Sequence, residues 1–371
     1  MAVYKIFPSK DATIYSRYPN KNTGLDEILS ISIEDAQDSG NTQASRVLLQ
    51  FSDTEISDVI NNKINGSTWS ASLKLYASVI NGLNSDTTLE IYPISGSWNM
   101  GTGKYAYSPE YTNGVSWYSR LLSGSGNWST SGFSAFVTAS YRSTSGGGTW
   151  YTGSSNVTIL PIYTTQSFSF YDDKDINTDV TNIVKAWLSG SIPNDGFIIK
   201  QAVEFVDSLQ YNNTMEYFSR DTHTIYPPQL EFKWVDFSYN TGSLSPLTTT
   251  EATIAIDENP GVFYPESINR FRVNARPEYP TRVFQTASYF VQTYYLPTAS
   301  YYAVKDLDTN EYVIDFDTQF TKLSCDANGN YFDLYMNGLE PERYYSILIK
   351  TTISGSTIVF DNNYNFKVIN A

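Results

Sequence analysis

The stretch Arg46-Val47-Leu48-Leu49-Gln50-Phe51 has the pattern of a β-strand with a buried face. Because successive side chains of a strand point to opposite faces, Val47, Leu49 and Phe51 would share one face of a sheet. Short runs rich in β-branched and aromatic residues recur at residues 72–77, 89–92, 197–200 and 230–234. Clusters of turn-forming residues separate these runs, as in sandwiches and jelly rolls. The sequence therefore predicts an all-β fold.

One segment has helical periodicity. Its apolar residues recur at i, i+3, i+4 and i+7, namely Val180, Ile183, Val184 and Trp187. Asp179 can accept amide hydrogen bonds at the helix start, and Gly190 can end the helix. We expect one short helix over residues 179–188, in which Trp187 is a structural residue, and no long helices.

The charge balance limits the classes of partner. The chain has 371 residues, and its 24 Lys and Arg against 38 Asp and Glu give a formal net charge of −14. An acidic chain without clustered Lys and Arg is a poor non-specific binder of nucleic acid. No run approaches the roughly 18 apolar residues of a transmembrane helix, and the first residues lack the apolar core of a signal peptide. We expect no nucleic acid, no membrane, and synthesis in a cytoplasm without an export signal.

Reactive residue types are scarce. The single cysteine, Cys325, excludes an intrachain disulfide and a cysteine-based zinc site. The single histidine, His223, would have to carry any serine-type triad or histidine-rich metal site alone. Gly101-Thr102-Gly103-Lys104 lacks the spacing of a phosphate-binding loop, because Trp98 and Tyr105 occupy the positions that require glycine and Ser or Thr. The sequence indicates no enzyme and no catalytic residue.

A composition shift after Trp234 indicates a domain boundary. Residues 238–246 are poor in apolar residues and rich in turn formers. We therefore divide the chain into a domain at residues 1–235, a linker at 236–250 and a second domain at 251–371.

Residues 95–153 form a segment rich in glycine and tryptophan. They contain eleven of the 22 glycines and four of the seven tryptophans, Trp98, Trp117, Trp128 and Trp150. The segment is either a set of long loops pinned by tryptophans against the sheet or a contact surface. Because ordering so many glycines is costly and Trp is common at interface hot spots, we take the four tryptophans as interaction candidates. We expect at least one to be buried at a subunit interface.

Asp11-Ala12-Thr13-Ile14-Tyr15 followed by Tyr18-Pro19-Asn20-Lys21-Asn22-Thr23-Gly24 resembles the opening of DNRLRE-type domains. The similarity continues in the family's order through residues 46–51, 71–76, 179–187, 196–199, 218–220 and 228–230. It implies a β-jelly roll related to carbohydrate-binding modules, some of which bind alginate-type polysaccharides. Asp11 and Arg46 are expected to be structural, with Arg46 paired to an acidic group or a loop carbonyl.

The middle of the first domain departs from that family. The usual short Trp-Glu to Thr-Trp segment is replaced by residues 97–104 and a distant Gly114-Val115-Ser116-Trp117. This expanded form is similar to virion proteins of large contractile-tailed phages, especially marine ones. The departure removes the usual sugar-facing arrangement of the carbohydrate-binding relatives.

The C-terminal part has the pattern of an immunoglobulin- or fibronectin-like sandwich. Leu339, Pro341 and Tyr345 match the Leu-x-Pro-x-x-x-Tyr corner, in which the tyrosine hydroxyl bonds to backbone across the corner. The complete fold prediction is an N-terminal jelly roll with long Gly/Ser/Trp loops and one short helix, followed by this β-sandwich. Cys325 is expected to be structural.

A metal site has only weak candidates. Asp172, Asp173 and Asp175 could contribute oxygen ligands to calcium, but they lack the spacing and the glycine of a helix-loop-helix calcium site. A solvated turn before the helix is the favoured interpretation. No cofactor is expected, although a structural calcium ion stays possible.

These observations lead to one functional hypothesis and two rivals. The hypothesis is a non-enzymatic virion structural protein of a tailed phage, present in several copies or as a homo-oligomer. It would contact other virion proteins at the periphery of the tail, neck or baseplate, or as head decoration of the capsid. The rivals are an adhesin that binds a host glycan, which exposed rings at Trp117, Trp128 and Trp150 would favour, and a polysaccharide depolymerase.

Overall fold

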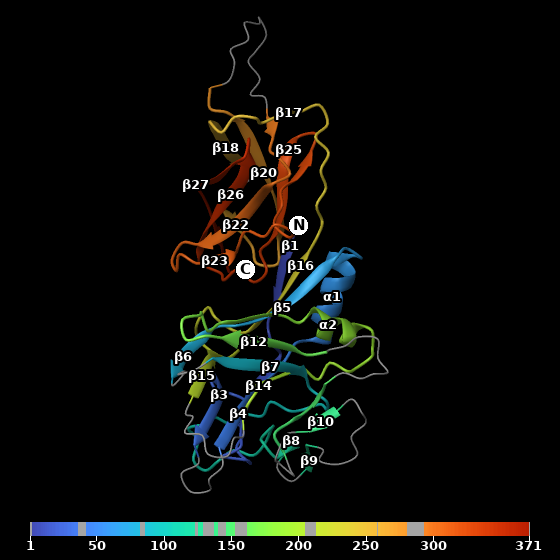
Figure 1. The fold of residues 1–371 in the computed structure, drawn as a ribbon, viewed down its shortest axis with the longest axis vertical. Helices are drawn as coiled ribbons and strands as arrows, with labels where there is room; N and C mark the ends of the chain where they lie inside the picture. The colour runs from blue at the N-terminus through green and yellow to red at the C-terminus, as the bar shows by residue number, and fades with distance from the viewer. Residues whose placement is uncertain are drawn as a thin grey trace, which may run out of the picture. The chain divides into compact units, whose positions relative to one another are not determined.

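The computed structural model describes residues 2–35, 42–81, 86–122, 125–128, 137–139, 146–152, 162–204, 213–257, 259–279 and 293–370. The chain divides into two compact units. The N-terminal unit comprises Ile6–Asn61 and Ser70–Glu231, and the C-terminal unit comprises Met1–Lys5, Asn62–Trp69 and Phe232–Ala371. The described residues form an all-β sandwich fold with short helices, as the sequence predicts (Figure 1).

The strands of the N-terminal unit are short. They are β2 (Lys10–Tyr15), β3 (Ile28–Asp35), β4 (Thr42–Gln50), β5 (Trp69–Leu75), β6 (Ala77–Asn81), β7 (Thr87–Pro93), β8 (Ser119–Leu122), β9 (Ser125–Asn127), β10 (Val137–Ala139), β11 (Thr149–Tyr151), β12 (Thr164–Phe168), β13 (Ile176–Asp179), β14 (Phe197–Gln201) and β15 (Asn213–Phe218). The main sheet has the order β12-β7-β14-β4-β3-β15-β6, with β2 paired to β4. In a four-stranded sheet of order β1-β16-β5-β13, β13 and most of β5 belong to this unit. Most of β1 (Ala2–Ile6) and part of β16 (Gln229–Trp234) belong to the C-terminal unit.

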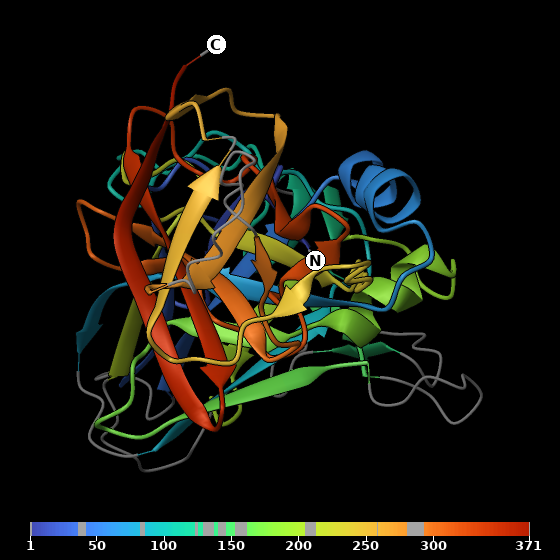
Figure 2. The ribbon, with the colours of Figure 1, turned by 90° about the horizontal axis from the view of Figure 1, so that it is seen from above.

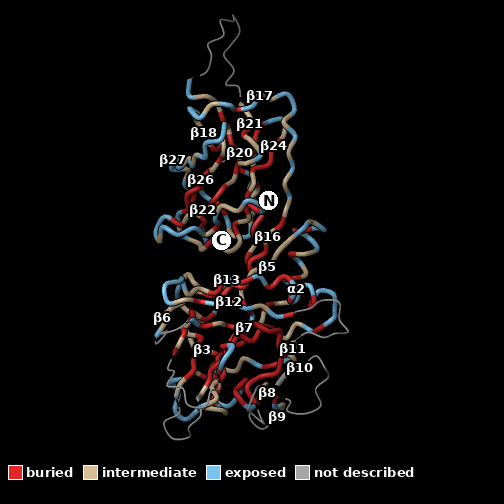
Figure 3. The backbone as a smooth tube through the Cα atoms, in the orientation of Figure 1, coloured by how far each residue is buried: buried red, intermediate tan, exposed pale blue. Residues whose placement is uncertain are grey.

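Strand β4 is buried on both faces. It pairs antiparallel with β2, β3 and β14 along its length. Phe51, which follows β4, packs against Phe197 on the face that the sequence pattern assigns to Val47 and Leu49. Leu48 belongs instead to a cluster that contains all four tryptophans of the Gly/Trp segment. The loops of that segment therefore cover the second face of the sheet, and buried residues line the strands in Figure 3.

Two short helices interrupt the strands. Helix α2 (Thr181–Leu188) begins two residues later than expected, because Val180 still donates its amide to the carbonyl of Ala71 on β5. Asp179 accepts the amide of Thr181 at 2.7 Å, and the predicted apolar face is buried. Helix α1 (Asp53–Asp58) continues into the π-helical segment η1 (Val59–Ile64) and is absent from the sequence prediction. Ile56 of α1 is buried, as are Val59 and Ile64 of η1.

The C-terminal unit consists of two sheets. Its strands are β17 (Ser245–Pro246), β18 (Ala252–Asp257), β19 (Val262–Phe263), β20 (Ile268–Pro277), β21 (Tyr294–Tyr295), β22 (Ser300–Asp306), β23 (Tyr312–Ile314), β24 (Ser324–Asp326), β25 (Gly329–Tyr335), β26 (Tyr344–Ile353) and β27 (Ser356–Val368). One sheet has the order β17-β21-β20-β25-β24, with β18 paired to β20, and the other has the order β19-β27-β26-β22-β23. The long strands β26 and β27 are antiparallel and lie side by side as red arrows in Figure 2.

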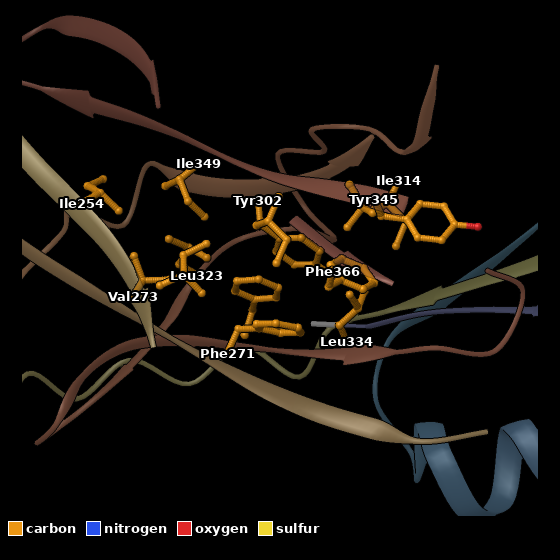
Figure 4. Packing of buried hydrophobic residues seen from close by; sticks show 14 of the residues in the cluster. Ile254, Phe271, Val273, Tyr302, Ile314, Leu323, Leu334, Tyr345, Ile349 and Phe366 are labelled. Carbon is orange, nitrogen blue, oxygen red and sulfur yellow. The ribbon is translucent and has the colours of Figure 1, made fainter. Parts of the chain in front are cut away.

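An aromatic core joins these two sheets. Phe271 on β20 stacks on Phe332 of β25, with ring centroids 5.2 Å apart, and Phe332 stacks on Tyr302 of β22. Tyr345 and Phe366 contribute rings from the second sheet (Figure 4). Burial of such large apolar surfaces is the main favourable term in folding this unit.

The C-terminal unit includes two segments that the sequence analysis placed outside it. The ring of Tyr335 lies 5.9 Å from that of Tyr4 and 5.2 Å from that of Trp234, so the first residues of the chain belong here. The expected linker 236–250 is bonded to this unit, because Cys325 donates its amide to Ser238 and Asn240 donates to Cys325. Leu247 is buried in the same core.

Candidate functional site

Arg46 lies at the centre of the N-terminal unit. Its side chain is fully buried on the face of β4 that the Gly/Trp segment covers. Nε donates to Glu204 Oε1 at 2.8 Å, a second nitrogen bonds to Glu204 Oε2, and a third donates to the carbonyl of Gly147. The arginine therefore has both kinds of partner that the sequence analysis expects, an acidic group and a loop carbonyl.

Two indole rings enclose this ion pair. The Arg46 guanidinium lies 4.7 Å from the ring centre of Trp117 and 5.2 Å from that of Trp150. A second ion pair joins Lys200 Nζ to Glu90 Oε2, 2.7 Å apart. A buried charge is tolerated only when it is paired and hydrogen-bonded, and the flat guanidinium satisfies several acceptors at once. The arrangement holds β4 to the loops at Gly147 and Glu204, which is a structural role.

The four tryptophan candidates are buried within their own chain. Trp98, Trp117, Trp128 and Trp150 are only 1%, 3%, 2% and 4% exposed. Trp98 Nε1 donates to the carbonyl of Asp195 at 2.8 Å, and Trp128 Nε1 donates to that of Ser116 at 3.0 Å. The prediction that these rings form a contact surface is wrong, because they already bury their area against β2, β4, β7 and β14. The alternative, loops pinned by tryptophans against the sheet, describes the segment.

Asn22 explains the glycines that resemble a phosphate loop. Its buried side-chain amide donates to the carbonyls of Met100 and Val115, and Oδ1 accepts the amide of Gly103 at 2.8 Å. A Cβ atom on Gly101 would lie 2.3 Å from Asn22 Oδ1, so only glycine allows this approach. The Gly-rich loop is therefore fixed around a structural asparagine.

Asp11 is buried at the start of β2. Its Oδ2 accepts the amide of Arg220 at 2.6 Å. Burial raises the pKa of the Asp11 carboxyl to about 7, although the Arg220 hydrogen bond opposes this shift. The contact ties β2 to the turn after β15, which fits the expected structural role of Asp11.

The acidic cluster before α2 forms a turn. Asp172 Oδ2 accepts the amide of Ser169 at 2.7 Å, whereas Asp175 Oδ1 accepts the amide of Ala77 at 2.7 Å. Asp173 Oδ1 accepts the amide of Asp175 at 3.2 Å. The structure does not bring the three carboxylates together, and the described residues contain no group of three or more His, Cys, Asp or Glu side chains that could hold a metal ion.

The corner before β26 has the expected hydrogen bond. Tyr345 Oη donates to the carbonyl of Glu340 at 3.1 Å, five residues earlier. Leu339 is buried, and Pro341 follows it at the turn.

Trp187 of α2 packs on Phe197 with ring centroids 4.7 Å apart. Cys325 is buried on β24, where burial raises the pKa of its thiol to about 11, and His223 is exposed.

A second feature of the Gly/Trp segment is a set of exposed tyrosines. Tyr105, Tyr107 and Tyr111 are 44%, 38% and 46% exposed. Tyr105 packs on Tyr18 with ring centroids 5.6 Å apart, and Tyr107 packs on Tyr111 at 5.1 Å. We call these four residues the tyrosine surface. The sequence analysis missed it, although the run Lys104-Tyr105-Ala106-Tyr107-Ser108-Pro109-Glu110-Tyr111 has aromatic residues without aliphatic ones larger than Ala or Pro.

The C-terminal unit has a different exposed surface. Val262 on β19 and Tyr344 on β26 both pair with Lys367 on β27, so the three residues form a row across neighbouring strands. Val262, Tyr264 and Tyr344 are 48%, 62% and 53% exposed. We call Val262, Tyr264 and Tyr344 the β19–β26 surface. Tyr264 lies two residues after Val262 and therefore extends the row along the chain.

Comparisons with known proteins assign no family. No protein-family description matches this chain, and no curated protein matches it. Among solved structures, a DUF4785 family protein from Legionella pneumophila aligns over 98% of this chain and 66% of its own, with 7% sequence identity and a TM-score of 0.19. A likeness this small carries no argument about fold or function. Within the described residues, no helix is long and apolar enough to cross a bilayer.

Proposed function

We propose that the chain is a non-enzymatic virion structural protein of a tailed phage. The expanded Gly/Trp segment, which resembles such proteins, supports this assignment. The observation that carries it is the β19–β26 surface, where Val262, Tyr264 and Tyr344 are exposed beside Lys367 of the paired strand β27. We assign this surface to contacts with another virion protein at the tail, neck or baseplate periphery, or at the head.

The geometry of the β19–β26 surface suits a protein contact. Phe263, between Val262 and Tyr264, points into the core and packs on Phe366 with ring centroids 5.6 Å apart. The backbone that carries Val262 and Tyr264 is therefore anchored by a buried neighbour, which reduces the backbone freedom to be lost on binding. Specific contacts bury about 800 Å² per partner, so these three side chains would form one part of a larger interface.

The buried polar groups support a role without catalysis. Arg46 is engaged by Glu204 and Gly147, and Asp11 accepts the amide of Arg220. Both sets of contacts hold loops to strands. Function then depends on the surfaces that the two units present, as in proteins that act through assembly.

Mass spectrometry of purified particles, combined with chemical cross-linking, tests the proposal. We expect the chain in several copies per particle, with cross-links from Lys367 to a different virion protein. Val262→Asp and Tyr264→Asp should prevent incorporation while the isolated protein keeps its melting temperature. Tyr279→Asp is the control, because Tyr279 is exposed in the same unit but lies outside the row. Absence of the chain from purified particles would overturn the proposal.

A further inference from the structure

The tyrosine surface is held rigidly at its base. Tyr105 receives two contacts from Asp26, whose carboxylate oxygens accept its amide at 3.0 and 3.1 Å. Lys21 Nζ donates to the carbonyl of Tyr105 at 3.0 Å, and the backbone amide of Asn22 donates to the carbonyl of Tyr111 at 2.8 Å. The loop is thus fixed at both ends while its side chains stay exposed, which reduces the entropy that binding would cost.

The charges around these rings compensate one another. Lys104 pairs with Glu27 at 3.0 Å and Arg17 pairs with Glu34 at 3.0 Å. Lys21 lies 3.7 Å from Glu110, and its Nζ is 4.7 and 4.8 Å from the rings of Tyr18 and Tyr105. Within a chain of net charge −14, this region therefore has little excess charge with which to attract an ionic partner.

The exposed side chains favour a ligand with many hydroxyl groups. The large exposed hydrophobic side chains among residues 104–118 are all tyrosines, and they are accompanied by the exposed side chains of Ser108, Glu110, Thr112 and Asn113. A tyrosine ring offers an apolar face to C–H groups and a hydroxyl to polar groups. Protein interfaces are also enriched in methionine and arginine side chains, which residues 105–113 lack.

We propose that the tyrosine surface is a binding site for a neutral glycan. The pyranose rings stack on Tyr107 and Tyr111 through their C–H faces, and their hydroxyls bond to the polar side chains beside them. The site differs from the four buried tryptophans, which pack against the strands of the sheet. It is separate from the β19–β26 surface, which lies in the other unit.

The test uses the isolated full-length protein on immobilised glycans. The neutral probes are cellohexaose, laminarihexaose, mannohexaose and dextran, and the acidic probes are alginate and chondroitin sulfate. We expect at least one neutral probe to bind, with an affinity that changes little between about 50 and 500 mM salt, since no ion pairs form on binding. The double variant Tyr107→Ala/Tyr111→Ala should weaken binding by at least about tenfold.

Tyr171→Ala is the matched control, because Tyr171 is an exposed tyrosine of the same unit outside this loop. Its affinity should equal that of the unaltered protein, and all variants should keep the same melting temperature. The proposal is overturned if no neutral probe binds, if only acidic probes bind, or if the double variant binds as well as the control. Loss of particle assembly in the double variant without glycan binding would assign the loop to a protein contact instead. Because binding is read on isolated protein, the result is independent of where the chain lies on a virion.

Discussion

The side-chain amide of Asn22 donates a hydrogen bond of 2.8 Å to the backbone carbonyl of Val115, 93 residues further along the chain. The same nitrogen donates to Met100 at 2.7 Å. One buried asparagine thus joins the turn after β2 to two points of the Gly/Trp segment. This side chain acts together with Asp26 and Lys21, which hold Tyr105 of the tyrosine surface.

Asn22→Asp should destabilise the protein. The new carboxyl has nearly the same shape but, when ionised, lacks the donors that satisfy the carbonyls of Met100 and Val115. Leaving buried acceptors unsatisfied costs about 1–3 kcal/mol, more with a buried charge. Urea denaturation measures the difference. Asn113→Asp is the control, because Asn113 is exposed on the same segment and bonds to Thr102; equal losses in the two variants would contradict the role of Asn22.

Arg46→Met should destabilise the N-terminal unit by about 3–5 kcal/mol, since it leaves the buried Glu204 carboxylate without its arginine. Arg46→Met/Glu204→Leu should recover part of this loss, because neither charge is then left alone. Chemical denaturation followed by tryptophan fluorescence measures the free energy of unfolding of both variants, because Trp117 and Trp150 lie on the guanidinium. Arg17→Met, at an exposed ion pair with Glu34, should leave the denaturation midpoint unchanged. A double variant as unstable as the single one would contradict this explanation.

Asp11 should make stability depend on pH. Burial raises the pKa of its carboxyl to about 7 in the folded state, against about 3.9 when unfolded. Between these values the folded protein holds more protons, so stability falls as pH rises from about 4 to about 7 and then levels off. Asp11→Asn has no buried carboxyl to ionise and therefore avoids this loss of stability. Its side-chain oxygen can still accept the Arg220 amide.

The melting temperature of Asp11→Asn minus that of the unaltered protein should therefore increase from pH 4 to 7 and stay constant above. The gain at neutral pH is on the order of a few kcal/mol. The difference between the two proteins removes the contribution of the other carboxylates. A difference that does not change with pH would show that Asp11 titrates alike in both states.

Tyr345→Phe should cost about 1 kcal/mol, because it removes the hydrogen bond to the carbonyl of Glu340 and keeps the ring in the core. Its neighbour gives a matched control. Tyr344 is exposed, so Tyr344→Phe should have little effect on stability. Thermal unfolding of both variants measures the contrast, and similar melting temperatures would argue against a stabilising corner.

Local patterns in the sequence were sufficient where neighbours along the chain decide the structure. The i, i+3, i+4, i+7 pattern located α2, and Leu-x-Pro-x-x-x-Tyr located the corner at Tyr345. Helix α1 was missed because it is only six residues long, has one buried apolar residue, Ile56, and continues as a π-helix. Its amphipathic pattern is too short and irregular to stand out.

Composition alone misplaced the tryptophans. Trp98, Trp117, Trp128 and Trp150 are equally suited to an interface or a core, since both environments bury indole rings. Only the structure shows that the second face of β4 needed a cover, which these four rings supply. The exposed tyrosines between them went unnoticed, because exposure depends on what packs above a residue.

The sequence by itself determined the all-β class, the short helix α2 and the residues of the tyrosine corner, because these follow from the period and order of side chains within one element. Only the tertiary structure decided that Tyr4 packs with Tyr335, that Arg46 meets Glu204, and which aromatic residues of the Gly/Trp segment face outward. The physical reason is that these contacts join residues far apart in the chain. Their partners are set by how whole strands and loops fill a shared interior, which no local pattern encodes.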